Sequence, residues 1–395
     1  MELLRKILTS LTICALTFKV CDVAFGYFVG ERQLLIYGNQ GRSLALRELS
    51  PNQHVKIRPM PTELKHALTL VDKEYLVRTD FNGFIMTGNE VIHEPTHRIL
   101  FLGGSTTESR FVDEKQRFPS LVEQGLRDYG IDVNVFNGGV AGSHSLHSNL
   151  NLMGKSLPLN LAIAVWMHNV NDLGLLSKTN SYWQAPATKA VIIESEQQYE
   201  NLSVFHVALA VKDFFIPNLY GYLKPRLWPS LKFSRPDEYQ EFRSEKSLSK
   251  INFRQVEQQF LQSILTFINI CRAWNIEPIL MTQFNQIESK SGIFEQEYSE
   301  FHGMDIEVYV HLYQSFNEII RLAARENEVA IIDLANEIPA DSHYMYDSVH
   351  LTSGGSERVS EVITPILIDI LGSGAMRSYK KTKNVVREKK ILPRE

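Results

Sequence analysis

Small and polar residues that could do chemistry occur in four short blocks that lie far apart in the sequence. The blocks are Gly103-Gly104-Ser105, residues 137–142, residues 169–172 and residues 347–350. The first three follow apolar runs of strand length, and the fourth lies between the last such run and the last helical pattern. Because catalytic groups gather at the carboxyl ends of the strands in open parallel sheets, the four blocks predict one polar site at one sheet edge.

Ser105 stands where a nucleophile could be exposed. Two glycines precede it at a predicted strand-to-helix turn, and such a turn exposes the Oγ and leaves backbone N–H groups unpaired nearby. Two other interpretations stay open at this point: Ser105 could cap the following helix, or the glycines could bind phosphate. The second is disfavoured, because the sequence carries neither the G-x-G-x-x-G spacing nor a Walker lysine here.

Asp347 and His350 could activate such a serine. A serine hydroxyl needs a base, and the base needs a carboxylate that orients its other ring nitrogen. An aspartate three residues before a histidine can supply both groups from one loop. Asp-x-x-His pairs often arise by chance, but this one lies between the last predicted strand and the last predicted helix, near the same sheet edge.

Three other histidines, His144, His147 and His168, also lie near the predicted edge and raise the possibility of a metal site. No H-x-H motif, H-E-x-x-H motif or carboxylate-rich spacing accompanies them, so we expect no metal and no other cofactor. Forty-one Lys and Arg residues against 45 Asp and Glu residues leave a net charge of −4. Such a balance provides no general basic surface, so we expect no nucleic-acid partner.

The four blocks together resemble the SGNH or GDSL-type hydrolases. Their signature is a serine in a G-D-S-like turn, a glycine after the second strand, an asparagine in G-x-N-D, and a D-x-x-H near the end. Order and spacing fit over residues 97–372. The resemblance implies that Ser105 is the nucleophile, that His350 is the base and that Asp347 orients the base.

The same resemblance implies an oxyanion hole formed by the Ser105 N–H, the Gly142 N–H and the Asn171 side chain. Two departures from the family pattern bear on it. Gly104 stands where the family name has aspartate, which removes no catalytic group. Asn169 replaces the glycine of G-x-N-D, which could reshape the loop that holds Asn171.

Apolar runs and helical periodicity predict the elements that position these blocks. Five strands are expected at residues 98–102, 133–136, 161–166, 278–281 and 329–333, and helices at 118–129, 253–274, 306–326 and 356–371. Strands that alternate with helices indicate a three-layer α/β/α fold with a five-stranded parallel sheet, of the SGNH or flavodoxin-like kind.

The predicted sheet occupies only part of the chain. We expect an accessory segment at residues 31–96, an SGNH hydrolase-like domain at 97–375 and a basic tail at 376–395. An insertion at about residues 173–249, rich in aromatic residues and prolines, separates the third and fourth strands. It could form a lid or a substrate wall, and it could equally pack on a core of its own.

Residues 1–30 carry a targeting pattern. Arg5 and Lys6 precede the apolar run 7–18, and apolar character resumes at 23–29. Residues 1–30 are therefore expected to be a signal peptide or a membrane anchor, and a buried or interfacial helix is the third interpretation. Both membrane interpretations place the catalytic domain outside the cytoplasm.

An exported domain of this kind resembles bacterial proteins that add or remove O-acetyl groups on cell-surface polysaccharides. The resemblance implies a serine esterase that acts on ester-linked acyl groups, O-acetyl groups above all, through a Ser-His-Asp triad and an acyl-enzyme. Its substrate would be an acylated small molecule or polysaccharide. The alternatives are an O-acyltransferase for cell-surface polysaccharide and a non-catalytic carbohydrate-binding or assembly protein on the same fold.

Overall fold

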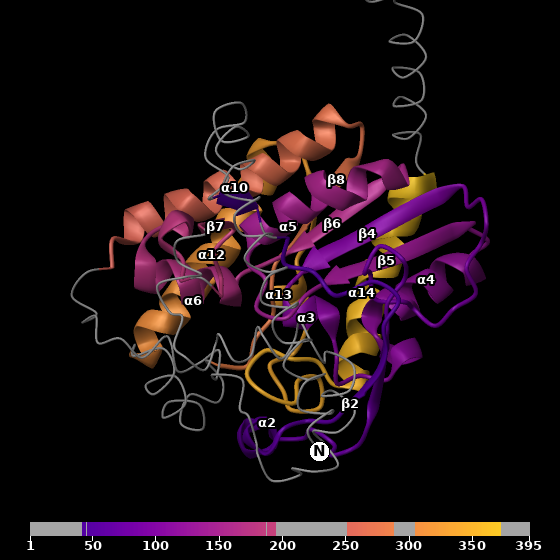
Figure 1. The fold of residues 1–395 in the computed structure, drawn as a ribbon, viewed down its shortest axis with the longest axis horizontal. Helices are drawn as coiled ribbons and strands as arrows, with labels where there is room; N and C mark the ends of the chain where they lie inside the picture. The colour runs from indigo at the N-terminus through magenta and orange to yellow at the C-terminus, as the bar shows by residue number, and fades with distance from the viewer. Residues whose placement is uncertain (1–41, 45, 187, 195–250, 288–304, 373–395) are drawn as a thin grey trace, which may run out of the picture. The chain divides into compact units, whose positions relative to one another are not determined.

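The computed structural model describes residues 42–44, 46–186, 188–194, 251–287 and 305–372 (Figure 1). The chain divides into two compact units. In the first, residues 1–45 and 192–232, the described strands β1 (Arg42–Leu44) and β7 (Ile192–Glu194) pair antiparallel. The second, residues 46–191 and 233–395, contains the large sheet and every predicted site residue.

The large sheet is parallel and has the strand order β5-β4-β6-β8-β9 (Figure 1). Its strands are β4 (His97–Gly103), β5 (Val133–Gly139), β6 (Ile163–Met167), β8 (Glu277–Met281) and β9 (Ala330–Ile332). The chain steps outward from β4 to β5 and then returns past β4 to β6. The strand order therefore reverses between β4 and β6, which is the point where open α/β sheets bind their ligands.

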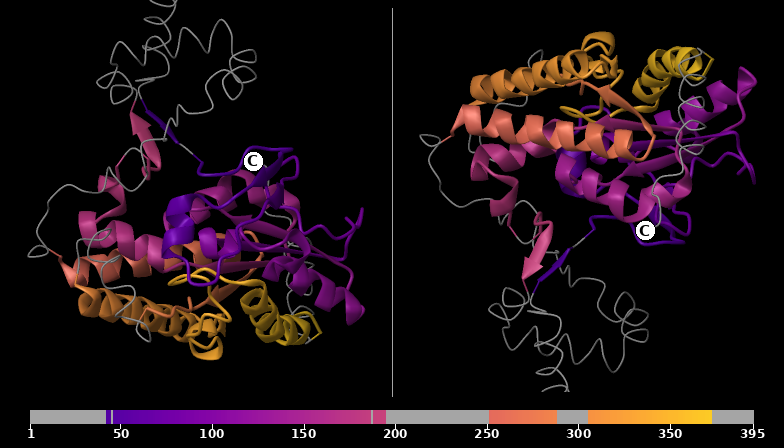
Figure 2. Two further views of the ribbon diagram at one scale, coloured as in Figure 1. Left: turned by 90° about the horizontal axis from the view of Figure 1, so that it is seen from below. Right: turned by 90° about the horizontal axis from the view of Figure 1, so that it is seen from above.

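Both faces of the sheet are apolar, so helices cover both. In β4, Ile99 and Phe101 join one core while Leu100 and Leu102 join the other, as the period of two in a strand requires. The first core includes α4 (Phe118–Asp128) and α14 (Ser353–Gly372), and the second includes α6 (Val170–Thr179), α10 (Phe253–Ala273) and α12 (Ile306–Glu326). The long helices α10 and α12 lie side by side (Figure 2). The predicted three-layer α/β/α fold is confirmed.

Shorter elements complete the described part of this unit. They are β2 (His54–Ile57), α2 (Pro61–His66), β3 (Tyr75–Arg78), α3 (Ser105–Glu108), α5 (Ser145–Asn151) and α13 (Leu334–Glu337), the 3₁₀ helices η1 (Glu114–Gln116), η3 (Leu157–Leu159) and η4 (Tyr182–Gln184), and the π-helical turn η2 (Leu152–Ser156).

One strand extends further than the sequence predicted. The residues Asn137-Gly138-Gly139 were expected in a loop, but they continue β5, where Gly138 and Gly139 pair with Leu102 and Gly103. The Asn137 side chain accepts the N–H of Gly139 (2.9 Å), and the Asn137 carbonyl accepts the N–H of Ile85 (2.9 Å). These bonds compensate for the low strand propensity of two glycines. The loop at the sheet edge therefore begins only at Val140.

Residues 46–96 pack in the same unit as the sheet. Strands β2 and β3 pair antiparallel, and Tyr75 of β3 begins a line of buried aromatic rings. Tyr75 contacts Phe111 (ring centroids 5.7 Å apart) and Phe111 contacts Tyr346 (6.3 Å). The turn predicted around Asn82-Gly83 is present, with Gly83 at φ +77°. The segment that was expected to be accessory thus reaches the loop that carries His350.

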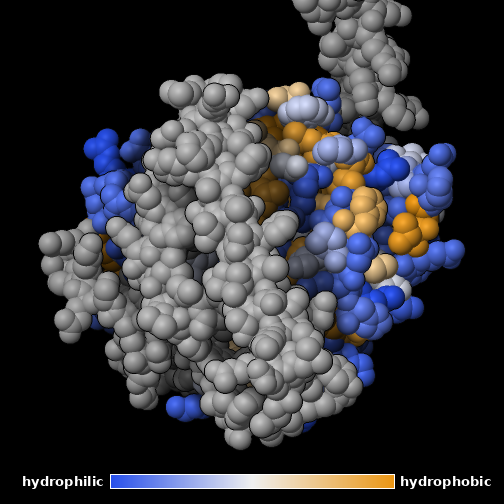
Figure 3. All heavy atoms as spheres, viewed as in Figure 1, coloured by the Kyte–Doolittle hydropathy of each residue, from blue (hydrophilic) through white to orange (hydrophobic). Residues whose placement is uncertain are grey.

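The apolar N-terminal segment (1–30), the basic tail (376–395) and residues 195–249 of the predicted insertion lie outside the described residues. Within the described ranges, no helix combines the length and the apolar character needed to cross a membrane. Hydrophobic and hydrophilic residues are mixed on the described surface that faces the viewer in Figure 3.

We expect Gly139→Ala to destabilise the protein, because Gly139 lies directly against the backbone of α3. An added Cβ would overlap the backbone nitrogen of Glu108 and lie 2.6 Å from the carbonyl carbon of Thr107. Overpacking of this kind costs about 1–3 kcal/mol of the free energy of unfolding, measurable by urea or thermal unfolding. Gly372→Ala is the matched control, since nothing lies within 4 Å of its Cβ position. Equal stability of the two variants would contradict the close packing of α3.

Candidate active site

Ser105 begins α3 directly after β4 ends. The chain turns through Gly103 and Gly104, and an added Cβ on Gly103 would overlap the Thr107 hydroxyl and lie 2.8 Å from the Met167 carbonyl oxygen. Only glycine therefore lets α3 fold back this tightly onto the sheet. The turn leaves Ser105 half-buried at the carboxyl end of β4, beside the point where the strand order reverses.

The structure brings Ser105, His350 and Asp347 together, although Ser105 and His350 are 245 residues apart in the chain. Ser105 Oγ lies 2.7 Å from His350 Nε2, and His350 Nδ1 lies 2.7 Å from Asp347 Oδ2. The second Asp347 oxygen accepts the backbone N–H groups of Val349 (3.0 Å) and His350 (2.8 Å). With Nδ1 donating to the carboxylate, Nε2 is the acceptor for the Ser105 hydroxyl.

Two side chains fix the loop that carries this pair. The Tyr346 ring stacks on the His350 imidazole, with centroids 5.6 Å apart and planes 9° from parallel, and it ends the aromatic line that starts at Tyr75. Gln286 donates from its side chain to the Asp347 carbonyl (2.5 Å) and from its backbone to the Ser348 carbonyl (3.0 Å). Tyr346 thus packs against one face of the imidazole, and Gln286 fixes the backbone of the loop that carries it.

The charges of the pair stabilise each other. Burial lowers the pKa of His350, but the charge and hydrogen bond of Asp347 raise it more, and the pKa ends above its ordinary value of 6.5. Burial raises the pKa of Asp347, but the charge and hydrogen bond of His350 lower it more, below 3.8. Asp347 therefore stays ionised at neutral pH and stabilises the imidazolium that forms when His350 takes a proton.

The three predicted oxyanion donors lie at neighbouring strand ends. Among the described residues, nothing accepts the N–H of Ser105 or that of Gly142, and Gly142 has φ +70°. Asn171 Nδ2 donates to the Ser143 carbonyl (2.9 Å). Because an amide nitrogen carries two hydrogens, one remains for a ligand. An added Cβ on Gly104 would overlap the Asn171 amide, so this amide lies next to the residue before Ser105.

That overlap bears on the first departure from the family pattern. A larger residue at Gly104 would require the Asn171 amide to move. The second departure does not disturb the loop. Asn169 has φ −165° and ψ −72°, outside the positive-φ region that favours glycine, and its buried amide donates to the Tyr313 carbonyl (2.9 Å) and to Asn317 (3.1 Å). Asn169 therefore anchors the loop to α12.

The sequence did not reveal two residues that connect the parts of the site. Gln283 donates to the Thr106 hydroxyl (2.9 Å) and accepts the N–H of Val170 (3.0 Å), which ties α3 to α6. Buried Glu108 accepts the N–H of Ala141 (2.5 Å) and pairs with Arg110 (3.0 Å). Of the two, only Glu108 could have been suspected from the sequence, because a carboxylate one helical turn after Ser105 can face the same site.

Asp172, the residue after Asn171, is the centre of a buried polar cluster. The fully buried Asp172 carboxylate accepts the hydroxyls of Ser145 and Tyr182 (2.5 Å each) and the Ser145 N–H (3.0 Å). Burial raises the pKa of Asp172 to about 6. Ser145 begins α5 and Tyr182 lies in η4, so Asp172 links both elements to the first turn of α6.

The three histidines considered as metal ligands join this cluster as neutral rings. His144 stacks on His147 with ring centroids 3.6 Å apart, and His168 bonds to Ser148 (2.7 Å). Burial lowers the pKa of His144 and of His168 to about 3, and it also lowers the pKa of His147. Over the ranges that the structure describes, no group of three or more His, Cys, Asp or Glu side chains could hold a metal ion.

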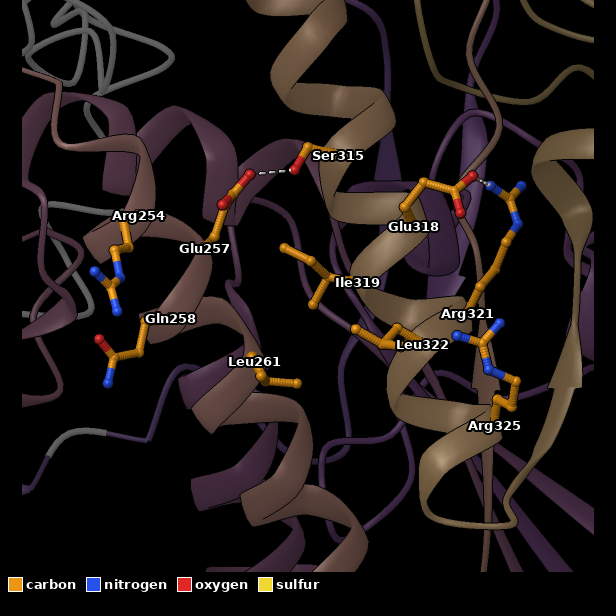
Figure 4. Close-up of a pocket in the computed structure, with 10 residues that line it drawn as sticks. All are labelled: Arg254, Glu257, Gln258, Leu261, Ser315, Glu318, Ile319, Arg321, Leu322 and Arg325. Atoms are coloured by element: carbon orange, nitrogen blue, oxygen red, sulfur yellow. Dashed lines mark hydrogen bonds and ion pairs between the residues drawn. The ribbon is translucent and has the colours of Figure 1, made fainter.

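A cavity of about 560 Å³ lies between α10 and α12 (Figure 4). Charged side chains surround a small apolar patch there, and the lining includes Arg254, Glu257, Ile319 and Arg325. It includes none of the residues predicted for catalysis. The chemistry suggested by the sequence therefore lies elsewhere, at the strand ends.

Comparisons with known proteins found similarity among solved structures only. No protein-family model and no curated protein matches the chain. Similar solved structures are a GDSL-like lipase from Bacteroides thetaiotaomicron (13% identity, 69% of this chain and 88% of that chain covered, TM-score 0.38) and a lipase/acylhydrolase from Enterococcus faecalis (13%, 69% and 95%, 0.40). A third is an acetyl xylan esterase from Geobacillus stearothermophilus (10%, 69% and 94%, 0.38).

Of these three, only the first is named as GDSL-like, the class that the four sequence blocks resemble. Their TM-scores are below 0.5 and their identities are at most 13%. The chemistry is therefore argued from the geometry of Ser105, His350 and Asp347 alone.

We expect Asp347→Asn to move the pH dependence of activity to lower pH. His350 must be neutral to accept a proton, so kcat/KM should rise with pH through the pKa of His350. Asp347 raises that pKa, and its neutralisation leaves burial to lower it. The plateau should fall by roughly 10²- to 10⁴-fold. Measurement of kcat/KM for p-nitrophenyl acetate against pH tests both. Asp341→Asn, at an exposed position before the loop, should leave the profile unchanged. A midpoint that stays or rises in Asp347→Asn would contradict the assignment.

We expect Asn171→Ala to lower kcat by about 10²- to 10³-fold with little change in KM, as for other single oxyanion donors. Asn171→Asp should be worse, because a carboxylate repels both the oxyanion and the Ser143 carbonyl. Steady-state kinetics measures both. Asn327→Ala is the matched control, since the Asn327 amide also donates to one backbone carbonyl (2.9 Å), at the end of α12. If Asn171→Asp keeps more activity than Asn171→Ala, Asn171 only shapes the loop.

Proposed function

We propose that the protein is a serine esterase of the SGNH type that cleaves ester-linked acyl groups, O-acetyl groups above all, through an acyl-enzyme. One observation carries the proposal: a continuous line of hydrogen bonds, 2.7 Å at each step, joins Ser105 Oγ to His350 and His350 to Asp347. The predicted donors Ser105, Gly142 and Asn171 follow the ends of β4, β5 and β6. A nucleophile, its base and a site for developing negative charge are the parts that acyl transfer needs.

In the first half-reaction, Ser105 Oγ attacks the ester carbonyl while its proton passes to His350 Nε2. The carbonyl oxygen becomes an oxyanion, and the N–H groups of Ser105, Gly142 and Asn171 donate to it. His350 then gives the proton to the leaving alcohol oxygen as the C–O bond breaks, and the acyl group stays on Ser105. Asp347 keeps its negative charge throughout and stabilises the transient imidazolium.

In the second half-reaction, a hydroxyl-bearing acceptor attacks the acyl-enzyme. With water, His350 takes the water proton and returns it to Ser105 Oγ, so a carboxylic acid leaves and the enzyme is restored. With a sugar hydroxyl, the same proton transfers would produce a new ester. The triad is common to both outcomes, and the acceptor decides between hydrolysis and acyl transfer.

The choice of O-acetyl groups and of a site outside the cytoplasm rests on the sequence. The four blocks resemble a family that includes exported polysaccharide-modifying proteins, and the pattern of residues 1–30 favours export. An acylated polysaccharide of the cell surface is therefore the substrate class to test first.

We expect Ser105→Ala and His350→Ala to lower ester cleavage by about 10³-fold or more, because groups that act as a unit lose nearly everything together. Cleavage is measured with p-nitrophenyl acetate, and a fluorophosphonate probe should label the native protein but not Ser105→Ala. Ser353→Ala is the control, since that hydroxyl is exposed and bonded to Gln116 (2.9 Å). Native-like turnover or labelling of Ser105→Ala would end the triad hypothesis.

The same assay separates the alternatives. Release of acetate from an acetylated polysaccharide in water supports the esterase. Ester formation on an added unacetylated oligosaccharide, with little free acetate, would replace it by the acyltransferase. A well-folded native protein that neither turns over ester nor takes up the probe would favour a non-catalytic binding or assembly role.

A further inference from the structure

Arg47 lies at the start of the described N-terminal segment, and its guanidinium binds the loop that holds the predicted oxyanion donor Gly142. Arg47 Nε and Nη2 both donate to the Ala141 carbonyl (3.0 and 2.8 Å), and Nη1 donates to the Thr188 carbonyl (2.8 Å). The side chain is therefore a two-pronged fork on one backbone oxygen. None of the four sequence blocks includes Arg47, and its contact with Ala141 spans 94 residues.

The bonds of the Ala141 and Gly142 backbone show why this fork matters. The Ala141 N–H donates to the Glu108 carboxylate (2.5 Å), the Ala141 carbonyl accepts from Arg47, and the Gly142 carbonyl accepts from Lys189 Nζ (2.9 Å). Charged side chains thus hold three of the four backbone polar groups. The fourth is the Gly142 N–H, which has no acceptor among the described residues.

The Ala141 carbonyl and the Gly142 N–H belong to the same peptide group. A carbonyl that accepts hydrogen bonds from a cation draws electron density from its peptide nitrogen, which makes the N–H a stronger donor, and linked hydrogen bonds strengthen one another in this way by about 10–30% per bond. The fork also fixes the plane of this peptide. An N–H with a fixed direction and a strengthened dipole is what a developing oxyanion requires.

We propose that Arg47 is a positioning residue for catalysis: it orients and polarises the Ala141–Gly142 peptide so that the Gly142 N–H donates to the oxyanion. The proposal rests on the proposed function. It assigns to residues 46–96 a part in the oxyanion hole, which the sequence expectation of an accessory segment did not include. Arg47 touches no reacting atom and acts only through the peptide.

The chain supplies a matched control for the fork. Arg127 Nε and Nη2 donate to one carbonyl, that of Val133 (3.0 and 2.9 Å), and Nη1 donates to the Glu90 carbonyl (2.8 Å). These carbonyl contacts match those of Arg47, but Val133 begins β5 and lies at the end of the strand opposite the site. Arg127 Nη2 also donates to the buried Glu123 carboxylate (2.9 Å) and to Asn134 (3.0 Å), so its removal should cost more stability. Removal of either arginine removes a fork on a backbone carbonyl, and only one of the two carbonyls belongs to the peptide of a predicted oxyanion donor.

The first experiment compares Arg47→Ala and Arg47→Lys with Arg127→Ala in steady-state kinetics on p-nitrophenyl acetate. We expect Arg47→Ala to lower kcat by about 10- to 100-fold with KM within threefold, a part of the loss that follows removal of a whole donor. Arg47→Lys, which keeps a charge but not the fork, should fall between. Guanidinium chloride at millimolar concentration should restore part of the kcat of Arg47→Ala. Arg127→Ala should lower the melting temperature but keep kcat within twofold.

The second experiment does not depend on activity. Ala141-Gly142 is the only Ala-Gly pair in the sequence, so labelling alanine with ¹³C at the carbonyl and glycine with ¹⁵N selects a single amide signal. We expect the amide proton of Gly142 to shift upfield in Arg47→Ala and in Arg47→Lys, and to stay in place in Arg127→Ala. This signal can be measured in any variant that folds, whether or not it turns over ester.

The outcomes separate this proposal from the proposed function. Absence of Ser105-dependent turnover in the native protein would overturn the esterase and, with it, the catalytic role of Arg47, whatever the amide shift. Native esterase activity together with a folded Arg47→Ala whose kcat is within twofold of native, or whose loss lies in KM, would overturn only the role of Arg47. An unmoved Gly142 signal would likewise overturn the polarisation. If Arg47→Ala does not fold, Arg47→Lys decides by the same two measurements.

Discussion

The close approach of α3 to the ends of β4 and β5 is the constraint on which the rest of the site depends. Three residues permit it, because Gly103, Gly104 and Gly139 lie where a Cβ would overlap atoms of α3 or of Asn171. The short helix can then begin at Ser105, whose N–H has no acceptor among the described residues. Without this contact Ser105 would lie away from the sheet edge, out of reach of the His350 imidazole and the Asn171 amide. The close packing of the α3 backbone on the strand ends therefore determines where the polar side chains of the site can meet.

The loops at this edge are fixed to one another by buried side chains rather than by the sheet alone. Gln283 connects the first turns of α3 and α6, Glu108 holds Ala141, and Asp172 connects α6 with α5 and η4. Buried polar groups of this kind are costly unless they are paired, so their geometry is strongly specified. The arrangement gives the candidate site the rigidity that electrostatic stabilisation of a transition state demands.

The sequence predicted the fold well, because apolar strand runs and amphipathic helices are local patterns. All five strands of the sheet and the long helices were expected near their observed bounds. The continuation of β5 through Asn137-Gly138-Gly139 was missed, since pairing with β4 and the bridge to Ile85 override a composition typical of loops. The three-dimensional proximity of Ser105, Asp347 and His350 could be anticipated from the parallel sheet, while their roles stay predictions.

The supporting residues could not be predicted in the same way. Arg47, Gln283 and Gln286 bond to Ala141, Thr106 and Asp347, which lie from 61 to 177 residues away in the chain, and no local pattern marks such contacts. Asn169 shows the reverse case. Its replacement of a family glycine suggested a changed loop, but its φ is negative and its amide is anchored on α12.

The line of aromatic rings from Tyr75 through Phe111 and Tyr346 connects the N-terminal segment to the His350 imidazole. A local opening that lifts β3 would uncover Phe111 and remove the support behind Tyr346, even while the parallel sheet stayed folded. A fragment trimmed to the first strand of the sheet would carry Ser105, Asp347 and His350 without that support.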